Sequence, residues 1–361
     1  MKYLTRIFGS RILKTGLAVF LTALLCKLLD LPAIFAVVTA IVTIEPTAAD
    51  SIKKGIVRLP ASAIGAAFSM TYAALLGDVP LAYTLATICT IFTCHKLKLE
   101  AGILVATLTA VTMIPFTPDH FLTAFFTRLG TTTIGLLVST LVNLFILPPD
   151  YSKKITKNIR NAYHDCSRLL ERQSRDIVKG TLNNGNVLPE LLKIEHSLLE
   201  TKKLCEYKYA EWKFHRHTEK QERLYHFECK HIEILQQVIY HFRNLSISHT
   251  SGNGWKDTEE IKVLSYLHSL STILRTPYPV IPTSHQILTG ELEKIFFKAK
   301  ETSYQSYIID KEKNLFSSSL KLLYEILSIN ELLIELTKIS MIDKPSDTEE
   351  ANQILKSVNN E

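Results

Sequence analysis

Charged residues are scarce in the first part of this chain. Residues 1–150 carry 18 of its Lys, Arg, Asp and Glu residues, whereas the remaining 211 residues carry 58. The overall composition, 47% hydrophobic and 21% charged, conceals this division. So few charges exclude an ordinary soluble domain in the first part, while the second part has the composition of one. We therefore expect domains at 1–150 and 151–340, followed by a flexible tail at 341–361.

The sequence also lacks the motifs of several classes of protein. It has no glycine-rich loop that would cradle a phosphate, which argues against a nucleotide-driven pump. It has no arrangement of a nucleophile and a base, so we do not expect an enzyme. The basic residues of the second part are interspersed with Glu, which disfavours a nucleic-acid partner. We expect no cofactor.

The six cysteines show no framework, because their spacing fits neither a disulfide scaffold nor a zinc knuckle. We expect them to be reduced thiols. A zinc site needs several ligands converging on one point, and of the clustered candidates only His226 and Cys229 share a helical face at neighbouring turns. We expect surface and partly packed histidines there, and no metal. The full cluster is His215, His217, His226, Cys229, His231 and His241.

What the first part does contain is apolar segments separated by turn formers or charges, at about 12–29, 33–47, 57–76, 80–94, 100–115 and 121–147. In lipid, backbone polar groups must be satisfied within the segment, so such runs predict packed helices. Lys and Arg gather at alternate segment ends, which predicts that both termini are cytoplasmic. The fold class expected is all-α: a six-helix polytopic membrane domain followed by a cytoplasmic helical bundle. Helical periodicity in the second part predicts spans at about 152–179, 187–216, 219–248, 257–275, 285–303 and 313–340.

A shift of 70 residues superposes two stretches of the membrane domain. Ten of the 37 positions from 33 to 69 are then identical, with Arg58 on Arg128 and Gly65 on Gly135. A three-helix repeat reverses its orientation in the membrane, and transport pathways lie at the interface of such inverted repeats. The alternative is chance similarity among apolar helices.

The second and fifth segments are short and rich in threonine, and they correspond under this shift. Their hydroxyl groups could line a pathway, or they could bond back to their own helices and allow close packing. The threonines concerned are Thr39, Thr43, Thr109 and Thr112.

Ionisable residues in or beside spanning helices are costly and suggest a function. Lys14, Arg58 and Arg128 would attract anions to the mouths of a pathway. The competing interpretation is that their side chains reach the lipid headgroups, above all for Lys14. Glu45 could carry a coupling proton, although a solvated loop acid is slightly favoured.

The residues of the first part resemble a known family. The run Arg11-Ile-Leu-Lys14-Thr-Gly-Leu-Ala, the stretch Ala36-Val-Val-Thr-Ala leading to Pro46-Thr47, and Arg58-x6-Gly65 look like the membrane domain of the aromatic acid exporter family. Arg128-x6-Gly135 and Asn143-x4-Pro148 fit its end, and the second part is similar to the helical domain of its short bacterial members.

This resemblance implies six-helix subunits that pair into a homodimer and move organic anions. It gives weight to Lys14, Arg58, Gly65, Arg128 and Gly135, with Gly65, Gly135 and Asn143 as structural positions. Pro60 and Gly130 follow the two arginines and could bend their helices away from the pathway.

The function expected is efflux of aromatic or related carboxylates across the cytoplasmic membrane. Arg58 and Arg128 would stabilise the carboxylate, and the threonines would supply hydroxyl groups. Two alternatives stay open: a passive organic-anion channel, and a membrane-anchored scaffold or sensor whose helical tail binds a partner.

Overall fold

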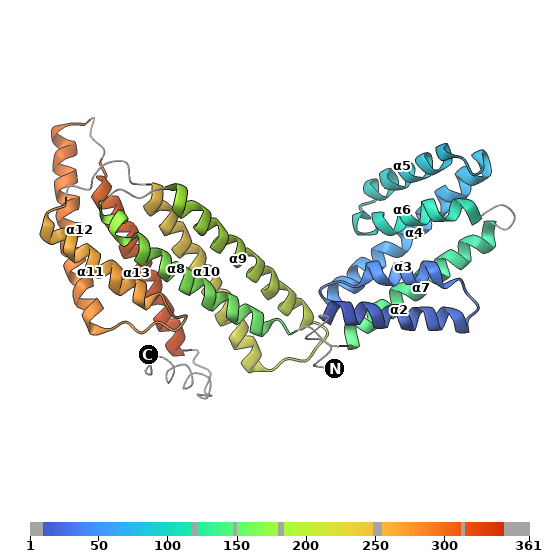
Figure 1. Ribbon diagram of the computed structural model, residues 1–361, viewed down its shortest axis with the longest axis horizontal. Coiled ribbons are helices and arrows are strands. Elements are labelled where there is room, and N and C mark those ends of the chain that lie inside the picture. Colours follow the sequence, from blue (N-terminus) through green and yellow to red (C-terminus); the bar gives the residue numbers. More distant parts are fainter. Residues whose placement is uncertain are drawn as a thin grey trace. The chain divides into compact units, whose positions relative to one another are not determined.

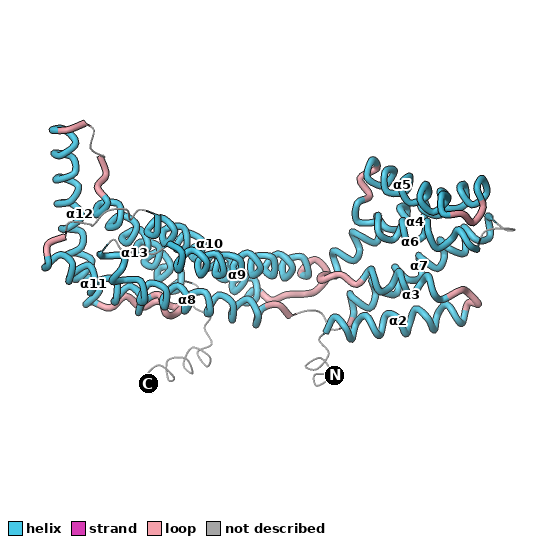
Figure 2. Tube along the Cα trace, turned by 45° about the horizontal axis from the view of Figure 1, so that its top comes forward, coloured by secondary structure: helices cyan, strands magenta, loops and turns pink. Residues whose placement is uncertain are grey.

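The computed structural model describes residues 10–116, 121–146, 150–179, 184–247, 255–311 and 315–342. Within these ranges the chain is all-helical (Figures 1 and 2). It divides into two compact units, of which the first comprises residues 1–150 together with Tyr207–Arg216, and the second the rest. Of the breaks expected between the segments, 117–120, 148–149, 180–183 and 250–254 lie outside the described residues, as does the tail from 343 onward.

In its described residues, the first unit contains six α-helices and two short 3-10 turns, Glu100–Gly102 and Ile114–Phe116. Local chemistry sets several of the helix ends. Thr47 caps α4 by accepting a hydrogen bond from the Asp50 N–H at 3.0 Å, and α4 stops at Gly77, whose φ of 72° suits glycine. Pro80 occupies the first turn of α5. The helices are α2 (Ser10–Leu28), α3 (Ala33–Thr43), α4 (Ala48–Leu76), α5 (Pro80–Lys96), α6 (Ile103–Met113) and α7 (Phe121–Phe145).

The bounds of these helices follow the 70-residue shift. Helix α2 begins at Ser10 and α5 at Pro80, while α3 covers 33–43 and α6 covers 103–113. The third helices are exchanged: α4 packs on α5 and α6, α7 packs on α2 and α3, and α4 and α7 contact each other. Figure 1 shows these two three-helix groups, α2 with α3 and α7, and α5 with α6 and α4. Each triplet thus contributes its last helix to the other.

By length and composition, two described helices are suited to cross a membrane, Ala48–Leu76 and Leu122–Phe145. The ranges Ala33–Thr43 and Glu100–Met113 are apolar but shorter. Six membrane spans therefore stay a prediction. The start expected for the third segment, residue 57, is wrong, because the Thr47 cap begins the helix at Ala48 and Pro60 lies inside it.

The second unit is built from amphipathic helices around one apolar core. Helix α8 packs against α10 and α11, α10 packs against α13, and α12 contacts α11 and α13. Tyr163 and Tyr266 are fully buried in this core with many Leu and Ile side chains. The expected helix at 187–216 is shorter at its end, because α9 stops at Glu211. The helices are α8 (Ser152–Lys179), α9 (Asn184–Glu211), α10 (Glu219–Ile247), α11 (Asp257–Ile273), α12 (Thr283–Ile309) and α13 (Ser318–Ile342).

Candidate anion site in the first unit

Two glycines allow the exchanged helices to approach closely. A Cβ at Gly65 of α4 would overlap the carbonyl oxygen of Ala106 in α6, and one at Gly135 of α7 would overlap the carbonyl oxygen of Ala36 in α3. The two contacts correspond under the 70-residue shift, which places Gly65 on Gly135 and Ala36 on Ala106. Small residues at helix crossings let backbones approach and increase their van der Waals contact. The two glycines thus allow the same close helix crossing at two equivalent places, α4 on α6 and α7 on α3.

A chain of hydroxyl groups links α4, α6 and α7. Ser62 Oγ lies 3.1 Å from Thr109 Oγ1 and 3.4 Å from Thr132 Oγ1. All three residues are buried. Ser62 and Thr132 are 70 residues apart, so two equivalent positions face each other where the triplets meet.

Arg128 ends this polar chain. Its Nη2 donates a hydrogen bond to Thr109 Oγ1 at 2.7 Å, and its guanidinium carbon lies 4.1 Å from the centre of the Phe35 ring. The residue is only 4% exposed. Its Nε and Nη1 have no hydrogen-bond partner among the described residues, and no described carboxylate pairs with it. A buried guanidinium with unused donors is a strong potential binding group for a carboxylate.

Arg58, the equivalent residue of the first triplet, is differently placed. Its Nη2 lies 2.6 Å from Glu45 Oε1, and its Nε donates to the Ala101 carbonyl at 3.2 Å. Glu45 also pairs with Lys54 at 2.8 Å. A shift of 70 residues places Pro115 opposite Glu45, so the second triplet has no matching acid. The two arginines are equivalent in position, but only Arg58 has a carboxylate partner among the described residues.

Glu45 is therefore neither exposed nor isolated. Its side chain is 12% exposed and binds two cations. The structure places it in an ion-pair network where α3 gives way to α4, rather than in the solvated loop that the sequence slightly favoured.

Asn143, which Lys14 binds, holds the connection between α3 and α4. Lys14 Nζ donates to Asn143 Oδ1 at 2.9 Å, and Asn143 Nδ2 donates to Ser51 Oγ at 2.8 Å and to the Thr47 carbonyl at 3.0 Å. Arg11 donates to the Ile44 carbonyl at 3.3 Å. Lys14 is buried, so it does not extend into solvent in the way that a headgroup contact would require.

The threonines expected to line a pathway mostly bond to their own helices. Thr39 donates to the Phe35 carbonyl, Thr43 to the Thr39 carbonyl and Thr112 to the Leu108 carbonyl, at 2.9, 2.6 and 2.6 Å. This is the back-bonding pattern of threonine in helices. Thr109 donates to the Val105 carbonyl and also accepts from Arg128. It alone of the four therefore belongs to the Arg128 cluster, by which we mean Arg128, Phe35, Thr109, Ser62 and Thr132.

Sequence reasoning did not single out Phe35, Ser62 or Thr132. Ser62 and Thr132 could have been found by reading the 70-residue shift for similar as well as identical residues. Phe35 gives no such signal, because Val105 stands at the equivalent position.

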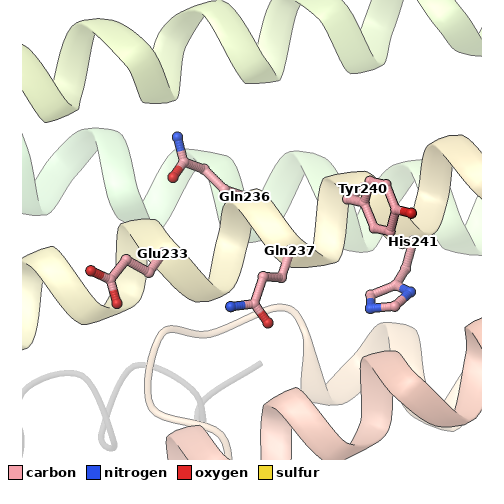
Figure 3. A pocket seen from close by; sticks show the side chains of 5 residues that line it. All are labelled: Glu233, Gln236, Gln237, Tyr240 and His241. Atoms are coloured by element: carbon pink, nitrogen blue, oxygen red, sulfur yellow. The ribbon is translucent and has the colours of Figure 1, made fainter.

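The described polar residues of the second unit do not form a comparable site. An open pocket of about 500 Å³ lies along α10 and is lined by Glu233, Gln236, Gln237, Tyr240 and His241, which project from one helix (Figure 3). His241 is bound to Glu325. Within the described residues, no three His, Cys, Asp or Glu side chains are placed to hold a metal ion.

Comparisons with known proteins bear on both units. Residues 6–146 match the family described as aromatic acid exporter family member 1. A UPF0421 protein of Bacillus cereus (strain ATCC 10987 / NRS 248) is 44% identical over 337 residues, which cover 92% of this chain and 94% of that protein. UPF0421 proteins of Oceanobacillus iheyensis and Halalkalibacterium halodurans are 36% and 34% identical, covering 90% and 95% of this chain and 93% and 92% of their own lengths.

Proposed function

Because the chain belongs to the UPF0421 protein family and carries an aromatic acid exporter domain, we propose that it moves aromatic or related carboxylates out of the cell across the cytoplasmic membrane. The observation that carries this proposal is Arg128, a buried guanidinium with no carboxylate partner among the described residues.

The helix arrangement supports a transporter built as an inverted repeat. Matching helix bounds, paired glycine contacts and the exchange of α4 and α7 all relate the same two triplets. Helices α3 and α6 have 11 residues each, or about 16 Å of helix, roughly half of the hydrocarbon thickness. Short helices in corresponding positions of two halves mark the binding region of many transporters.

Contacts within the first unit also support the proposal that the start of α2 and the end of α7 lie on the same side of the membrane. Lys14 near the start of α2 binds Asn143 near the end of α7, and Arg58 binds the Ala101 carbonyl between α5 and α6. The basic ends of the helices therefore meet at one end of the unit. This agrees with six spans and cytoplasmic termini, because an even number of crossings returns the chain to its starting side.

In this proposal the two arginines have different roles. Arg128 binds the substrate carboxylate beside Ser62 and Thr109. Arg58 is neutralised by Glu45 and holds the α3–α4 connection at the cytoplasmic end. The sequence suggested that both arginines bind the carboxylate. In this proposal only Arg128 does so. Two subunits pair into a homodimer, as the exporter resemblance implies.

Uptake of radiolabelled benzoate into proteoliposomes tests the proposal. A charged hydrogen bond is worth about 1.5–3 kcal/mol, so Arg128→Gln should raise the benzoate concentration for half-maximal uptake roughly 10- to 100-fold. Arg128→Lys should lose less, because the charge is kept. Lys27→Gln, which removes an exposed cation, is the matched control. Wild-type uptake by a monodisperse Arg128→Gln protein would reject the assigned role. Large unitary currents in electrical recordings would instead indicate a channel.

A further inference from the structure

Glu211 is a buried carboxylate that the proposed transport site does not use. It is the last residue of α9, and the segment Tyr207–Arg216 around it groups with the first unit. Its side chain is 7% exposed, and its Oε1 accepts a hydrogen bond from the backbone N–H of Ala48 at 2.7 Å. Ala48 is the first residue of α4, where free N–H groups and the helix dipole favour an anion.

A cation and a histidine complete the surroundings of this carboxylate. Lys14, which is 4% exposed, interacts with the charge of Glu211. His215 Nδ1 lies 3.0 Å from Glu211 Oε2, and His215 Nε2 lies 3.0 Å from the Leu144 carbonyl. Among the described residues, Oε2 has no hydrogen bond of its own. The segment is thus held at the start of α4 and the end of α7.

Helix α4 has a cap besides Glu211. Thr47, its own neighbour, already fills that role through the Asp50 N–H. Glu211 reaches Ala48 from 163 residues away and gives up most of its hydration. Burying a carboxylate is costly unless other contacts compensate. The Ala48 N–H, His215 and the charge of Lys14 offset this cost, and the same surroundings would favour any other carboxylate at this position.

We propose that Glu211 is an internal competitor of the substrate, a carboxylate plug that occupies an anion site formed by the Ala48 N–H and Lys14. A substrate carboxylate arriving at this end of the unit has the same chemistry as the Glu211 side chain. It binds the site only when the Tyr207–Arg216 segment withdraws. The helical tail would thereby set the substrate concentration at which export begins. This inference rests on the proposed function.

Benzoate uptake by Glu211→Gln and Glu211→Ala proteins tests the plug. If the plug occupies the site about nine-tenths of the time, the benzoate concentration for half-maximal uptake is roughly tenfold higher than it would be without the plug. Both variants should therefore reach half-maximal uptake at a lower benzoate concentration, by up to that factor. The matched control is Glu206→Gln, an exposed position of the same helix. If both Glu211 variants elute as monodisperse proteins and match the control, the plug is refuted.

Hydrogen exchange of the wild-type chain supplies a second test that needs no transport. At fixed pH, benzoate should speed exchange of the amides in 207–216, whereas benzyl alcohol, its uncharged analogue, should not. Unchanged exchange at saturating benzoate would refute the plug even if the variants fail to fold. Absence of benzoate uptake by the wild-type protein, or uptake indifferent to Arg128, would instead count against the proposed function. The two failures are therefore distinguishable.

Discussion

Replacing either of the two contact glycines by alanine should loosen the first unit. At Gly65 an added Cβ would lie 2.9 Å from the carbonyl carbon of Ala106 and closer still to its oxygen. At Gly135 it would lie 3.0 Å from the Thr39 Cβ and overlap the Ala36 oxygen. The obstacles at both positions include backbone atoms, so a side-chain rotation cannot make room, and the helices themselves must separate.

The expected cost is that of overpacking, about 1–3 kcal/mol for each replacement. Gly55 in α4 and Gly130 in α7 are matched controls, because a Cβ at either meets nothing within 4 Å. Their replacement by alanine should be neutral, or should stabilise by up to about 1 kcal/mol through helix propensity. The two contact glycines should behave alike, since they occupy the same crossing in the two triplets.

Thermal unfolding of the four alanine variants in detergent, followed by size-exclusion chromatography, measures the difference. For domains of this size, 1 kcal/mol corresponds to about 2–4 °C in Tm. Gly65→Ala and Gly135→Ala should both fall below the wild-type Tm, and the controls should not. If Gly65→Ala or Gly135→Ala unfolds at the same temperature as its same-helix control, the exchanged packing described above is wrong.

Three further predictions concern buried charges and titrating groups. Arg58→Gln should lower the free energy of unfolding by about 3 kcal/mol, and adding Glu45→Gln should restore much of it; no recovery in the double variant would contradict the ion-pair role. Burial lowers the pKa of His231 to about 4, below the ordinary 6.5 of an unfolded chain, so the unfolded state binds more protons between these values and stability falls as pH falls. Lowering the pH from 7.5 to 5 should therefore reduce the free energy of unfolding by about 2 kcal/mol. Amide hydrogen exchange in α10 should become faster over this range in the wild-type protein and change less in His231→Asn. An equal pH dependence of exchange in the two proteins would reject the role of His231. A hydrogen bond with Cys205 lowers the pKa of Cys229 to about 7, so iodoacetamide should modify Cys229 half-maximally near that pH; Cys205→Ala should move the midpoint upward, and an unmoved midpoint would count against the pairing.

Much of the helix pattern could be predicted from the sequence. The 3.6-residue periodicity of the second part predicted the six helices that the structure describes there within a few residues at most ends, because each helix must bury one apolar face. The main errors arose where capping overrode composition. Residues 48–56 carry several charges and fall between two expected segments, but Thr47 starts the helix there. The end of α9 at Glu211 likewise gave no clear signal.

Less of the candidate site could be predicted. The 70-residue shift drew attention to Arg58 and Arg128 together, and to Gly65 and Gly135 as structural positions. The shift could not show that Arg58 and Arg128 have different partners, because those partners are distant in sequence or differ between the triplets. Only one of four expected threonines belongs to the Arg128 cluster, since a hydroxyl in an apolar helix readily bonds to its own backbone.

The amino-acid sequence by itself determined the helical class and the charge-poor first part, since these depend on composition and periodicity along the chain, and it suggested the 70-residue relation between the two triplets. Tertiary structure alone decided that Glu45 neutralises Arg58, that Arg128 lies beside Phe35 with donors unused, and that Glu211 reaches the start of α4. The physical reason is that electrostatic balance depends on distance in space. Residues far apart in the chain become neighbours only when the helices pack.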